Sequence, residues 1–445
     1  MNTRTMVDSG VNWIENIPKD WKVSRFSTLG KPLKNINKDF KEKNRLALTM
    51  KGVVRRPLDD NHGLQANDYS GYQIFEKNDW VFKLIDLQNI KTSRVGLVPE
   101  RGIMSPAYIR VSSNKTSNEK FVYYTLYSAY LFNVFNDMGG GVRQTVGKEE
   151  LMEFLLPLPC ISEQQSIANF LDHHVSLIDR EAVLIDKKIE LLGDKRKSLI
   201  FECVTGKRTV VKKSSLTDSQ NVVGHGDLVG VPTDPEKMMD SGVEWIGDIP
   251  REWAIKRVKD VFTLVTQKTS NQTVYIGMEN IESNTGKKIS DIDARVSDNG
   301  NDSKFLQGDV LFGKLRPYLQ KVWLADVDGS CSTEFFVLRS TKNNKNNKKF
   351  FKNMFLSQNF CLEVNDRCGG VKMPRANWDD VGGMLISSPS LSTQNLISDF
   401  LHYEIDIIEE EISLLKRKQD LLIEKRKALI FEAVTGKIDC RSWTL

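Results

Sequence analysis

Four stretches of the sequence carry side chains whose hydrogen-bonding groups match the edges of nucleic-acid bases. Residues 82–83 (FK) and 312–318 (FGKLRPY) lie at the ends of apolar runs, and residues 141–145 (GVRQT) correspond to residues 370–375 (GVKMPR). Arginine can form two hydrogen bonds to guanine and glutamine can do so to adenine, whereas lysine more often neutralises phosphate. The residue types differ between the two halves of the chain, so we expect the halves to read different bases.

A further candidate region is strongly basic. Nine lysines and arginines between residues 31 and 57 are accompanied only by Asp39 and Glu42. This excess fits a polyanion, although a solvated surface loop explains the segment equally well. For each single residue in these regions, an ordinary solvated side chain is the open alternative. The candidate DNA-contacting residues are Lys41, Lys43, Lys51, Arg55, Arg56, Lys83, Arg143, Gln144, Lys314, Arg316, Tyr318, Lys372 and Arg375.

The usual combinations of catalytic residues are missing from the sequence. It contains no GxxxxGK(S/T) phosphate loop and no Asn/Asp-Pro-Pro-aromatic motif of adenine methyltransferases, and glycines 139–141 lack the rest of a nucleotide fingerprint. Five histidines offer little for a catalytic triad or a metal site, and His173-His174 is expected to be a surface pair. We therefore predict that the chain has no catalytic residue and binds no metal.

Composition places the chain in a broad class. Six cysteines without a CxxC pair favour a reducing cytosol over a disulfide framework or a zinc site. The N-terminus is polar and the apolar stretches are short, so we expect a cytoplasmic protein that does not contact membranes. A length of 445 residues allows several domains, and the net charge of +5 is mild.

The chain repeats itself. Residues 8–21 (DSGVNWIENIPKDW) return as residues 240–253 (DSGVEWIGDIPREW), and residues 195–207 (KRKSLIFECVTGK) return as residues 425–437 (KRKALIFEAVTGK). The offsets are 232 and 230 residues, and the sequences between the matched ends share almost nothing. Repeated end segments that enclose two divergent sequences suit a protein that recognises two different targets at a fixed separation.

Each half is predicted to contain a mixed α/β globular region. Short β-type runs follow turns near residues 78–79 and 308–309, and further strands are expected at 107–111 and 334–338. Apolar stripes predict helices over 121–135 and 349–364. The fold class is therefore α+β.

A heptad pattern predicts one long helix at the end of each half. Apolar residues alternate by four and three over 171–203, and the same register returns 230 residues later, interrupted by Arg196, Gln419 and Arg426. A second apolar flank, Leu177, Leu184 and Leu191 with Ile407, Leu414 and Leu421, exceeds what a two-helix contact needs, so a further partner helix is expected there. The predicted seam between the helices comprises Leu171, Val175, Ile178, Ile185, Ile189, Leu192, Arg196, Leu401, Ile405, Ile408, Ile412, Leu415, Leu422 and Arg426.

Glycine predicts the end of each long helix, and composition predicts a linker after the first one. Gly206 and Gly436 suit the left-handed residue beyond a helix C-terminus. The serine, glycine and proline content of residues 207–239 predicts a flexible linker between the halves.

These motifs resemble the specificity subunit of type I restriction-modification systems. The resemblance rests on the repeated DSGVxWIxxIPxxW segments, on SEQQSIAxFL at residues 162–171, and on the repeated KRKxLIFExVTGK endings, and it covers essentially the whole chain. One departure is Thr393-Gln394-Asn395 where the first half has Glu163-Gln164-Gln165. We expect this change to weaken capping at the start of the second helix.

The resemblance implies two pseudo-symmetric α/β target-recognition domains separated by an antiparallel pair of coiled-coil helices. Each domain would read one half of a split sequence in double-stranded DNA. Two methyltransferase subunits would dock on the helices, and restriction subunits would join the full complex. S-adenosylmethionine, ATP and magnesium would belong to those partners, with no cofactor in this chain. The expected division is 1–160 first domain, 161–206 helix, 207–239 linker, 240–389 second domain, 390–437 helix and 438–445 tail.

Helix geometry is compatible with this reading. Residues 171–203 would span about 48 Å at about 1.5 Å per residue, or about 14 base pairs of B-DNA. Two readers on one face of a duplex need a separation of about one helical turn. Two alternatives stay open: a diverged nuclease or methyltransferase component, which would need an acidic cluster or cofactor loop, and a coiled-coil scaffold that binds no DNA.

Overall fold

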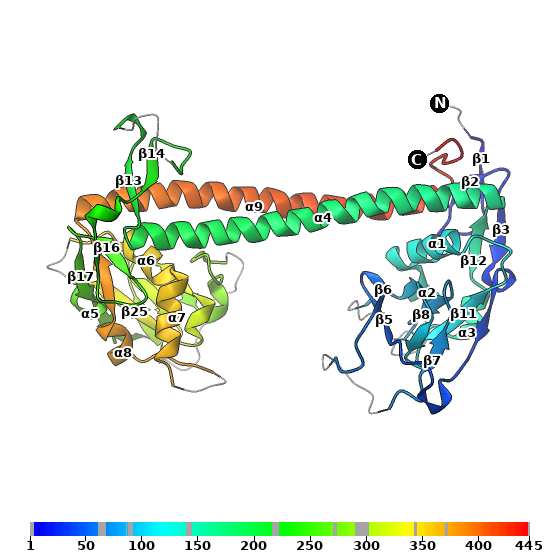
Figure 1. Cartoon of the computed structure of the whole chain (residues 1–445), viewed down its shortest axis with the longest axis horizontal. Coiled ribbons are helices and arrows are strands. Elements are labelled where there is room, and N and C mark those ends of the chain that lie inside the picture. The colour runs from blue at the N-terminus through cyan, green and yellow to red at the C-terminus, as the bar shows by residue number, and fades with distance from the viewer. Residues whose placement is uncertain are drawn as a thin grey trace. The chain divides into compact units, whose positions relative to one another are not determined.

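The computed structural model describes residues 4–60, 68–85, 87, 92–138, 145–215, 222–269, 274–289, 302–341, 345–369 and 373–443 of the 445-residue chain. Two compact units form, the first from residues 1–185 and 416–445 and the second from residues 186–415. Each unit therefore takes part of both long helices, α4 (Ile161–Val204) and α9 (Leu391–Val434) (Figure 1). The sequence-based division into separate helical and globular domains stays a prediction.

The first unit is built on a four-stranded antiparallel sheet in the order β4 (Gly30–Leu33), β11 (Ile109–Ser113), β8 (Trp80–Phe82) and β9 (Val95–Leu97). Trp80 and Phe82 of the central strand are fully buried and pack with helix α1 (Glu119–Leu131) in one core. Beside this sheet, β3 (Lys22–Arg25) pairs with β12 (Leu155–Leu158). The other elements are β1 (Met6–Asp8), β2 (Asn16–Pro18), β5 (Leu46–Thr49), β6 (Gly52–Arg55), β7 (Gln73–Phe75), β10 (Gly102–Met104), α2 (Val134–Met138), α3 (Lys148–Met152), and 3-10 turns at Phe26–Thr28 and Lys38–Phe40.

The second unit repeats this sheet with β18 (Phe262–Val265), β25 (Phe335–Ser340), β22 (Val310–Gly313) and β23 (Val322–Leu324). Strand β17 (Ala254–Arg257) pairs with β26 (Leu385–Ser388), and helix α6 (Lys348–Leu356) packs in the core. The other elements are β13 (Arg208–Lys212), β14 (Leu228–Pro232), β15 (Met238–Asp240), β16 (Asp248–Pro250), α5 (Val258–Val261), β19 (Lys268–Thr269), β20 (Tyr275–Ile276), β21 (Asp302–Phe305), β24 (Gly329–Cys331), α7 (Gln358–Asp366), α8 (Trp378–Gly383), and 3-10 turns at Lys213–Ser215, Pro235–Lys237, Met278–Asn280 and Pro317–Leu319.

The repeated sequence segments have the same internal environment in both units. The indole Nε1 of Trp13 donates to the carbonyl of Leu155 at 3.3 Å, and that of Trp245 donates to the carbonyl of Leu385 at 3.2 Å. Both acceptors are the first residues of the strand that precedes a long helix. The prediction of two similar α+β halves is confirmed. Outside the shared sheet the units differ, because the second has a further sheet in the order β19-β21-β24-β20.

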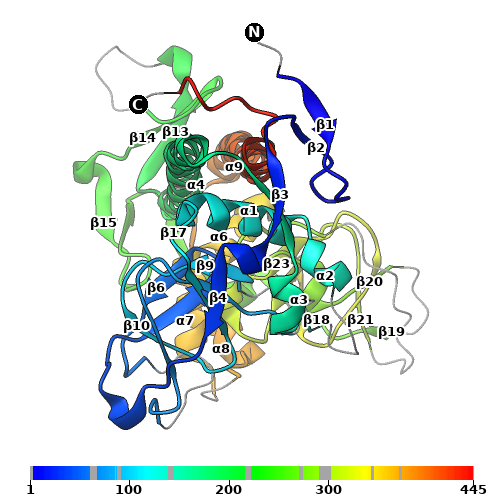
Figure 2. The same ribbon diagram turned by 90° about the vertical axis from the view of Figure 1, so that its right-hand side faces the viewer.

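Helices α4 and α9 run antiparallel within each unit (Figures 1 and 2). In the first unit Asp179 pairs with Arg426 at 3.0 Å and Glu181 with Lys418 at 2.7 Å. In the second unit Lys188 pairs with Glu411 at 2.7 Å and Arg196 with Glu409. As the residue number rises along α4, that of its partner on α9 falls.

Both long helices end two residues before the predicted glycines. Gly206 and Gly436 each have a φ of +74°, in the left-handed region. A Cβ atom at Gly206 would lie 2.3 Å from Pro250, and one at Gly436 would lie 2.5 Å from Pro18. Each proline belongs to a repeated IPxxW segment, so this contact explains why the glycine and the proline both recur in each half.

Glutamine side chains fix the starts of the long helices. Oε1 of Gln164 accepts the backbone N–H of Asn118 at 2.8 Å, and Oε1 of Gln394 accepts that of Asn347 at 2.9 Å. The start of α9 also has its own cap, because Oγ of Ser390 accepts the backbone N–H of Thr393 at 3.3 Å. The replacement of Glu163 by threonine in the second half therefore leaves these contacts in place.

Two expectations are corrected by the structure. Each predicted 15- to 16-residue helix is divided: Asn133, with a φ of +59°, separates α1 from α2, and the extended Ser357 separates α6 from α7. The region expected to be a flexible linker contains an antiparallel hairpin, β13 and β14, with five paired positions. The strands expected after the turns at 78–79 and 308–309 are confirmed as β8 and β22.

Candidate nucleic-acid interface

In the second unit, the loop that follows β22 lies against the segment that contains Arg375. The backbone N–H of Arg316 donates to the carbonyl of Pro374 at 2.8 Å, and that of Ala376 donates to the carbonyl of Lys314 at 2.9 Å. Arg316 and Gln320 have φ values of +50° and +52°, a conformation that non-glycine residues seldom adopt. The structure thus joins two stretches that the sequence had suggested separately. Together, residues 314–320 and 373–376 form what we call the second-unit loop pair.

The basic side chains of this loop pair differ in their surroundings. Nζ of Lys314 donates to the carbonyl of Thr333 at 2.8 Å and lies over the ring of Phe336 at 4.7 Å from its centroid. Burial, followed by the charge of Arg375, lowers the pKa of Lys314. This lysine therefore mainly holds the loop in place. Arg375 is half exposed, so its guanidinium is accessible to a ligand.

Glu334 was missed by the sequence reasoning and is central to this loop pair. Its Oε1 lies 3.1 Å from Nη2 of Arg375, while its Oε2 is buried without a hydrogen bond among the described residues. An arginine held at one nitrogen keeps other donors free for a base edge. Nε of Arg316 is likewise buried without a partner among the described residues, and the ring of Tyr318 is exposed. The side chains of Tyr318 and Arg375 are thus accessible at this loop pair, and the assignment of Arg316, Tyr318 and Arg375 to DNA contacts stays a prediction.

In the first unit, the basic segment forms a groove on the protein surface. Lys34, Lys38, Lys41 and Arg101 line a cavity of about 590 Å³. Glu42 also lines it and lies 3.0 Å from Nε of Arg101. Lys41 and Lys43 are exposed, and Lys51 lies in the turn of the β5–β6 hairpin. Lys34, Lys38 and Arg101 were not among the candidate residues. Arg101 comes from a separate stretch of the chain, so only the fold brings it to the groove.

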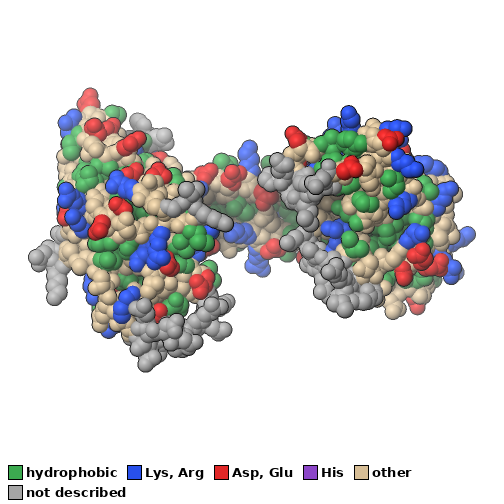
Figure 3. Space-filling view, turned by 90° about the horizontal axis from the view of Figure 1, so that it is seen from below, with side chains coloured by type: hydrophobic (Ala, Val, Ile, Leu, Met, Phe, Trp, Pro, Cys, Tyr) green, Lys and Arg blue, Asp and Glu red, His purple; other side chains and the backbone are tan. Residues whose placement is uncertain are grey.

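Two of the predicted first-unit arginines already have acidic partners. The guanidinium of Arg55 donates to both carboxylate oxygens of Glu100, at 3.0 and 2.5 Å, and Arg56 lies 3.4 Å from Asp60. The expected uncompensated excess of positive charge is therefore smaller than the sequence indicated. On the face drawn in Figure 3, basic and acidic side chains are interspersed over each globular part.

Four predicted residues have other outcomes. Nζ of Lys83 donates to the hydroxyl of Thr92 at 3.2 Å, which ties the end of β8 to the segment before β9. Arg143, Gln144 and Lys372 lie outside the described residues. Their assignment as DNA contacts stays a prediction.

The seam residues lie between the helices with graded burial. Leu171, Val175, Ile178, Ile185, Leu192, Leu401, Ile408 and Leu422 are buried, and Ile189, Ile405, Ile412 and Leu415 are half-buried. Arg196 is buried and pairs with Glu409, whereas Arg426 contacts the hydroxyl of Tyr127 at 3.2 Å in addition to Asp179. Each seam arginine thus pairs with an acid of the opposite helix in its own unit.

Both helices also carry exposed apolar side chains. In the first unit Leu177, Leu184 and Leu421 are 45 to 67% exposed, and in the second unit Leu191 and Leu414 are 59 and 61% exposed. Large apolar side chains on one helix face are typical of a surface that another protein covers. Ile407, the remaining member of the predicted second flank, is half-buried.

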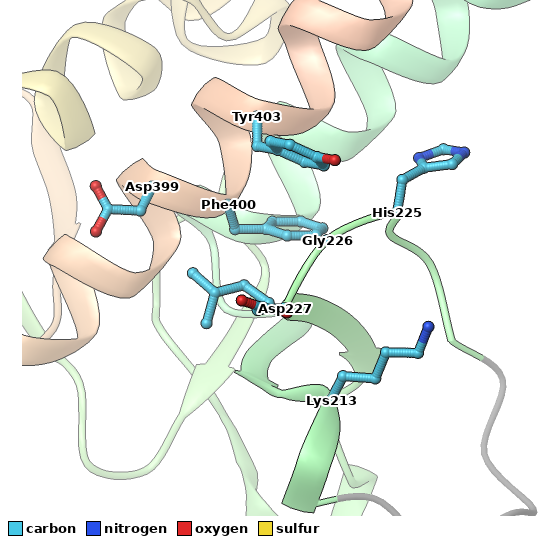
Figure 4. Close-up of a pocket in the computed structure, with 8 residues that line it drawn as sticks. Lys213, His225, Gly226, Asp227, Asp399, Phe400 and Tyr403 are labelled. Atoms are coloured by element: carbon cyan, nitrogen blue, oxygen red, sulfur yellow. The ribbon is translucent and has the colours of Figure 1, made fainter.

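The hairpin of the second unit forms a cavity with α9. Lys213, His225, Asp227, Phe400 and Tyr403 line a space of about 580 Å³ (Figure 4). Figure 4 shows the rings of Phe400 and Tyr403 projecting from α9 toward the loop that carries Gly226, just before β14.

A buried carboxylate attaches this hairpin to the helix. Glu404 of α9 accepts the backbone N–H of His225 at 2.7 Å and contacts its Nδ1 at 2.8 Å. Composition alone gave no signal of this contact, because the partners lie 179 residues apart.

Searches for two other kinds of site were negative within the described part of the chain. No group of three or more histidine, cysteine, aspartate or glutamate side chains is arranged to hold a metal ion there. Among the same residues, no helix is both long and apolar enough to cross a membrane.

Comparison with known proteins identifies the repeated unit. The family model for the type I restriction modification DNA specificity domain matches residues 18–191 and 250–417. The type I restriction enzyme EcoDI specificity subunit of Escherichia coli is 22% identical over 277 residues, which cover 60% of this chain and 59% of that subunit. The chain thus matches about three fifths of the length of this relative.

A solved structure shares the fold. A chain from a structural study of complex assembly and conformational transition in the type I R-M system superposes with a TM-score of 0.65 at 12% identity, over 95% of this chain and 99% of that chain. The HsdS subunit from Thermoanaerobacter tengcongensis gives a TM-score of 0.48 at 13% identity, over 95% of this chain and 98% of that chain.

Proposed function

The chain belongs to the type I restriction-modification DNA specificity family, and we propose that it reads a bipartite DNA sequence for a type I restriction-modification complex. The observation that carries this proposal is the match of two copies of the DNA specificity domain, one in each half of the chain. Both units contain the same four-stranded sheet, while the loops and additional strands around it differ. Two domains that bind different half-sites need this combination of a shared sheet with different loops.

Base reading in the second half-site is assigned to the second-unit loop pair. Arg316 and Arg375 offer guanidinium donors, and Arg375 is oriented by Glu334. A guanidinium held by a carboxylate loses little conformational freedom when it binds, which favours specific contacts to guanine in the major groove.

Phosphate contacts in the first half-site are assigned to the basic groove. Lys34, Lys38 and Lys41 line it, and lysine ammonium groups neutralise phosphates without reading sequence. Arg143 and Gln144 are proposed to read bases there, from their residue types alone.

The exposed leucines of α4 and α9 are proposed to bind methyltransferase subunits, two per chain. A helix from each partner would cover the apolar side chains that the helix pair leaves exposed. Restriction subunits would complete the complex. S-adenosylmethionine, ATP and magnesium would be bound by these partners, and the chain itself would act as a non-catalytic, cytoplasmic subunit.

Two other functions make different predictions. A diverged nuclease or methyltransferase component would modify DNA on its own, and a scaffold would bind the partner subunit but no DNA. Binding of the purified chain to a random-sequence duplex library is therefore measured with and without the cognate methyltransferase subunit, together with methyl transfer. We expect selection of one bipartite sequence and methyl transfer only with the partner. Methyl transfer by the chain alone, or no selection of DNA in the complex, would contradict the proposal.

A further inference from the structure

A second cavity of the second unit is lined by basic and polar side chains, one of which is buried without a partner among the described residues. It lies between the turn at residues 285–287, helix α6 and helix α9, and its volume is about 240 Å³. Asn353 of α6 and Ser398 of α9 line it and are 6 and 1% exposed. Among the described residues, Oγ of Ser398 is buried and makes no hydrogen bond. Buried polar groups are nearly always paired, so an unpaired hydroxyl that lines a cavity indicates a place for a ligand.

Positive charge surrounds the same cavity. Lys287, Lys349 and Lys352 line it. Burial, together with the charges of Arg196 and Lys287, lowers the pKa of Lys352 to about 8, so its ammonium is held in a desolvated and electropositive place. Nζ of Lys352 makes no hydrogen bond to any described residue. The ammonium, the amide and the hydroxyl are all able to donate, which favours a ligand that accepts hydrogen bonds.

Two acids lie near the cavity, and one of them lines it. Glu409 pairs with Arg196 and lies 3.5 Å from Lys287. Asp406 is a lining residue and lies 3.1 Å from Nδ1 of His402, which is charged only when protonated. These contacts leave Lys352 and Lys349 without a paired carboxylate among the described residues. The balance of charge at the cavity therefore favours an anion.

The first unit fills the corresponding place with its own side chains. Tyr123 and Tyr124 follow the capping Asn118 at the same intervals as Lys352 and Asn353 follow Asn347. The hydroxyl of Tyr124 donates to Asp172 at 2.8 Å, so this polar group is satisfied within the protein. Ala168 stands where α9 has Ser398, four residues after the repeated glutamine. The polar cavity is thus a property of the second unit rather than of the shared frame.

We propose that this cavity binds a phosphate-sized oxyanion, held by Lys352, Asn353 and Ser398. A bound anion connects helix α6 of the globular region to α9 and stabilises the turn at 285–287 beside them. The proposal does not depend on DNA reading or on a methyltransferase partner, so it can fail while the proposed function stands.

The test titrates the full-length chain with inorganic phosphate by calorimetry, at an ionic strength kept constant with sodium chloride. We expect one saturable site per chain. Lys352→Met and Ser398→Ala should each weaken phosphate binding about tenfold or more, because each removes a donor to a charged acceptor. Asn353→Tyr, which copies the residue of the first unit, should abolish binding by filling the cavity. Lys348→Met, on the same helix but outside the cavity, is the matched control and should bind like the wild type.

Two results overturn the proposal. One is the absence of saturable binding to the wild type, or equal binding by the wild type and by folded Ser398→Ala and Asn353→Tyr. The other is displacement of phosphate by a random-sequence DNA duplex at the same ionic strength, which would assign the cavity to the DNA backbone. Unchanged phosphate affinity in the presence of the duplex supports a separate site for a small anion.

Discussion

The side chain of Gln164 holds the first turn of helix α1 through the backbone of Asn118. Its Oε1 accepts the Asn118 N–H at 2.8 Å while its Nε2 donates to the carbonyl of Pro159 at 2.9 Å. Gln394 makes the same two bonds in the second unit, to Asn347 and Pro389, each at 2.9 Å. Both glutamines are buried, so these bonds help to fix each globular region to the start of its long helix.

Replacement of either glutamine should destabilise its own unit. Gln164→Ala or Gln394→Ala leaves one buried N–H and one buried carbonyl unpaired, at a cost of roughly 1 to 3 kcal/mol each. Urea unfolding would measure the loss, with Lys187→Ala, at an exposed position on helix α4, as the control. Equal stability of Gln164→Ala and Lys187→Ala would show that these bonds contribute nothing net.

Lys352 should make stability depend on alkaline pH. The pKa of Lys352 is about 8 in the folded chain, compared with 10.5 for a lysine exposed to water. The charge of Lys352 therefore destabilises the fold fully below pH 8. Its effect decreases between pH 8 and about pH 10.5. In phosphate-free buffer, Lys352→Met should therefore be more stable than the wild type at pH 7, by on the order of a few kcal/mol. The difference should shrink as pH rises above 8. Thermal unfolding of both proteins from pH 7 to 10 measures it, and a constant difference would contradict the assigned pKa.

Two exposed lysines of the first unit, Lys41 in the groove and Lys43 close to it in the chain, should affect affinity for DNA without affecting the preferred sequence. Lys41→Ala and Lys43→Ala are each expected to weaken binding to all sequences and to reduce the slope of log affinity against log salt by about 1. Arg55→Ala is the matched control, because Glu100 already neutralises this arginine. A lysine variant that changed the preferred sequence would contradict the assignment to phosphate.

The long helices should set the spacer between the half-sites. Insertion of four residues into one helix lengthens it by roughly 6 Å, which corresponds to a change of one to two base pairs. Methylation of a library that varies only in spacer length, with the partner methyltransferase present, would measure the shift. An active insertion variant with an unchanged spacer preference would exclude a ruler role for the helices.

Sequence patterns predicted those elements of the fold that are determined by residues close together in the chain. The long helices, their ends at Gly206 and Gly436, and strands β8 and β22 follow from periodicity and turn residues. The β13–β14 hairpin was missed because its partners lie far along the chain: Glu404 holds His225, and Val210 packs in the core of the second unit.

The residue types of the candidate site were predicted from the sequence, but the side chains with which they form ion pairs were not. Nothing near Arg55 or Arg375 in sequence indicates Glu100 or Glu334, since the fold alone brings these pairs together. The same limit applies to Lys352 and Ser398, which come from two helices. Residue type thus indicates the possible chemistry, while tertiary packing decides which groups are free to perform it.

The most direct test of the account is the methylation of a DNA library randomised in both half-sites by the chain and its methyltransferase partner. Arg375→Ala should relax the preference at one position or more of a single half-site, at a cost of roughly 1 to 3 kcal/mol per lost base contact. The other half-site and the spacer should remain unchanged, because the first unit has its own loops. Relaxation of both half-sites, or an unchanged preference in a folded variant, would contradict the reading of one half-site by each unit.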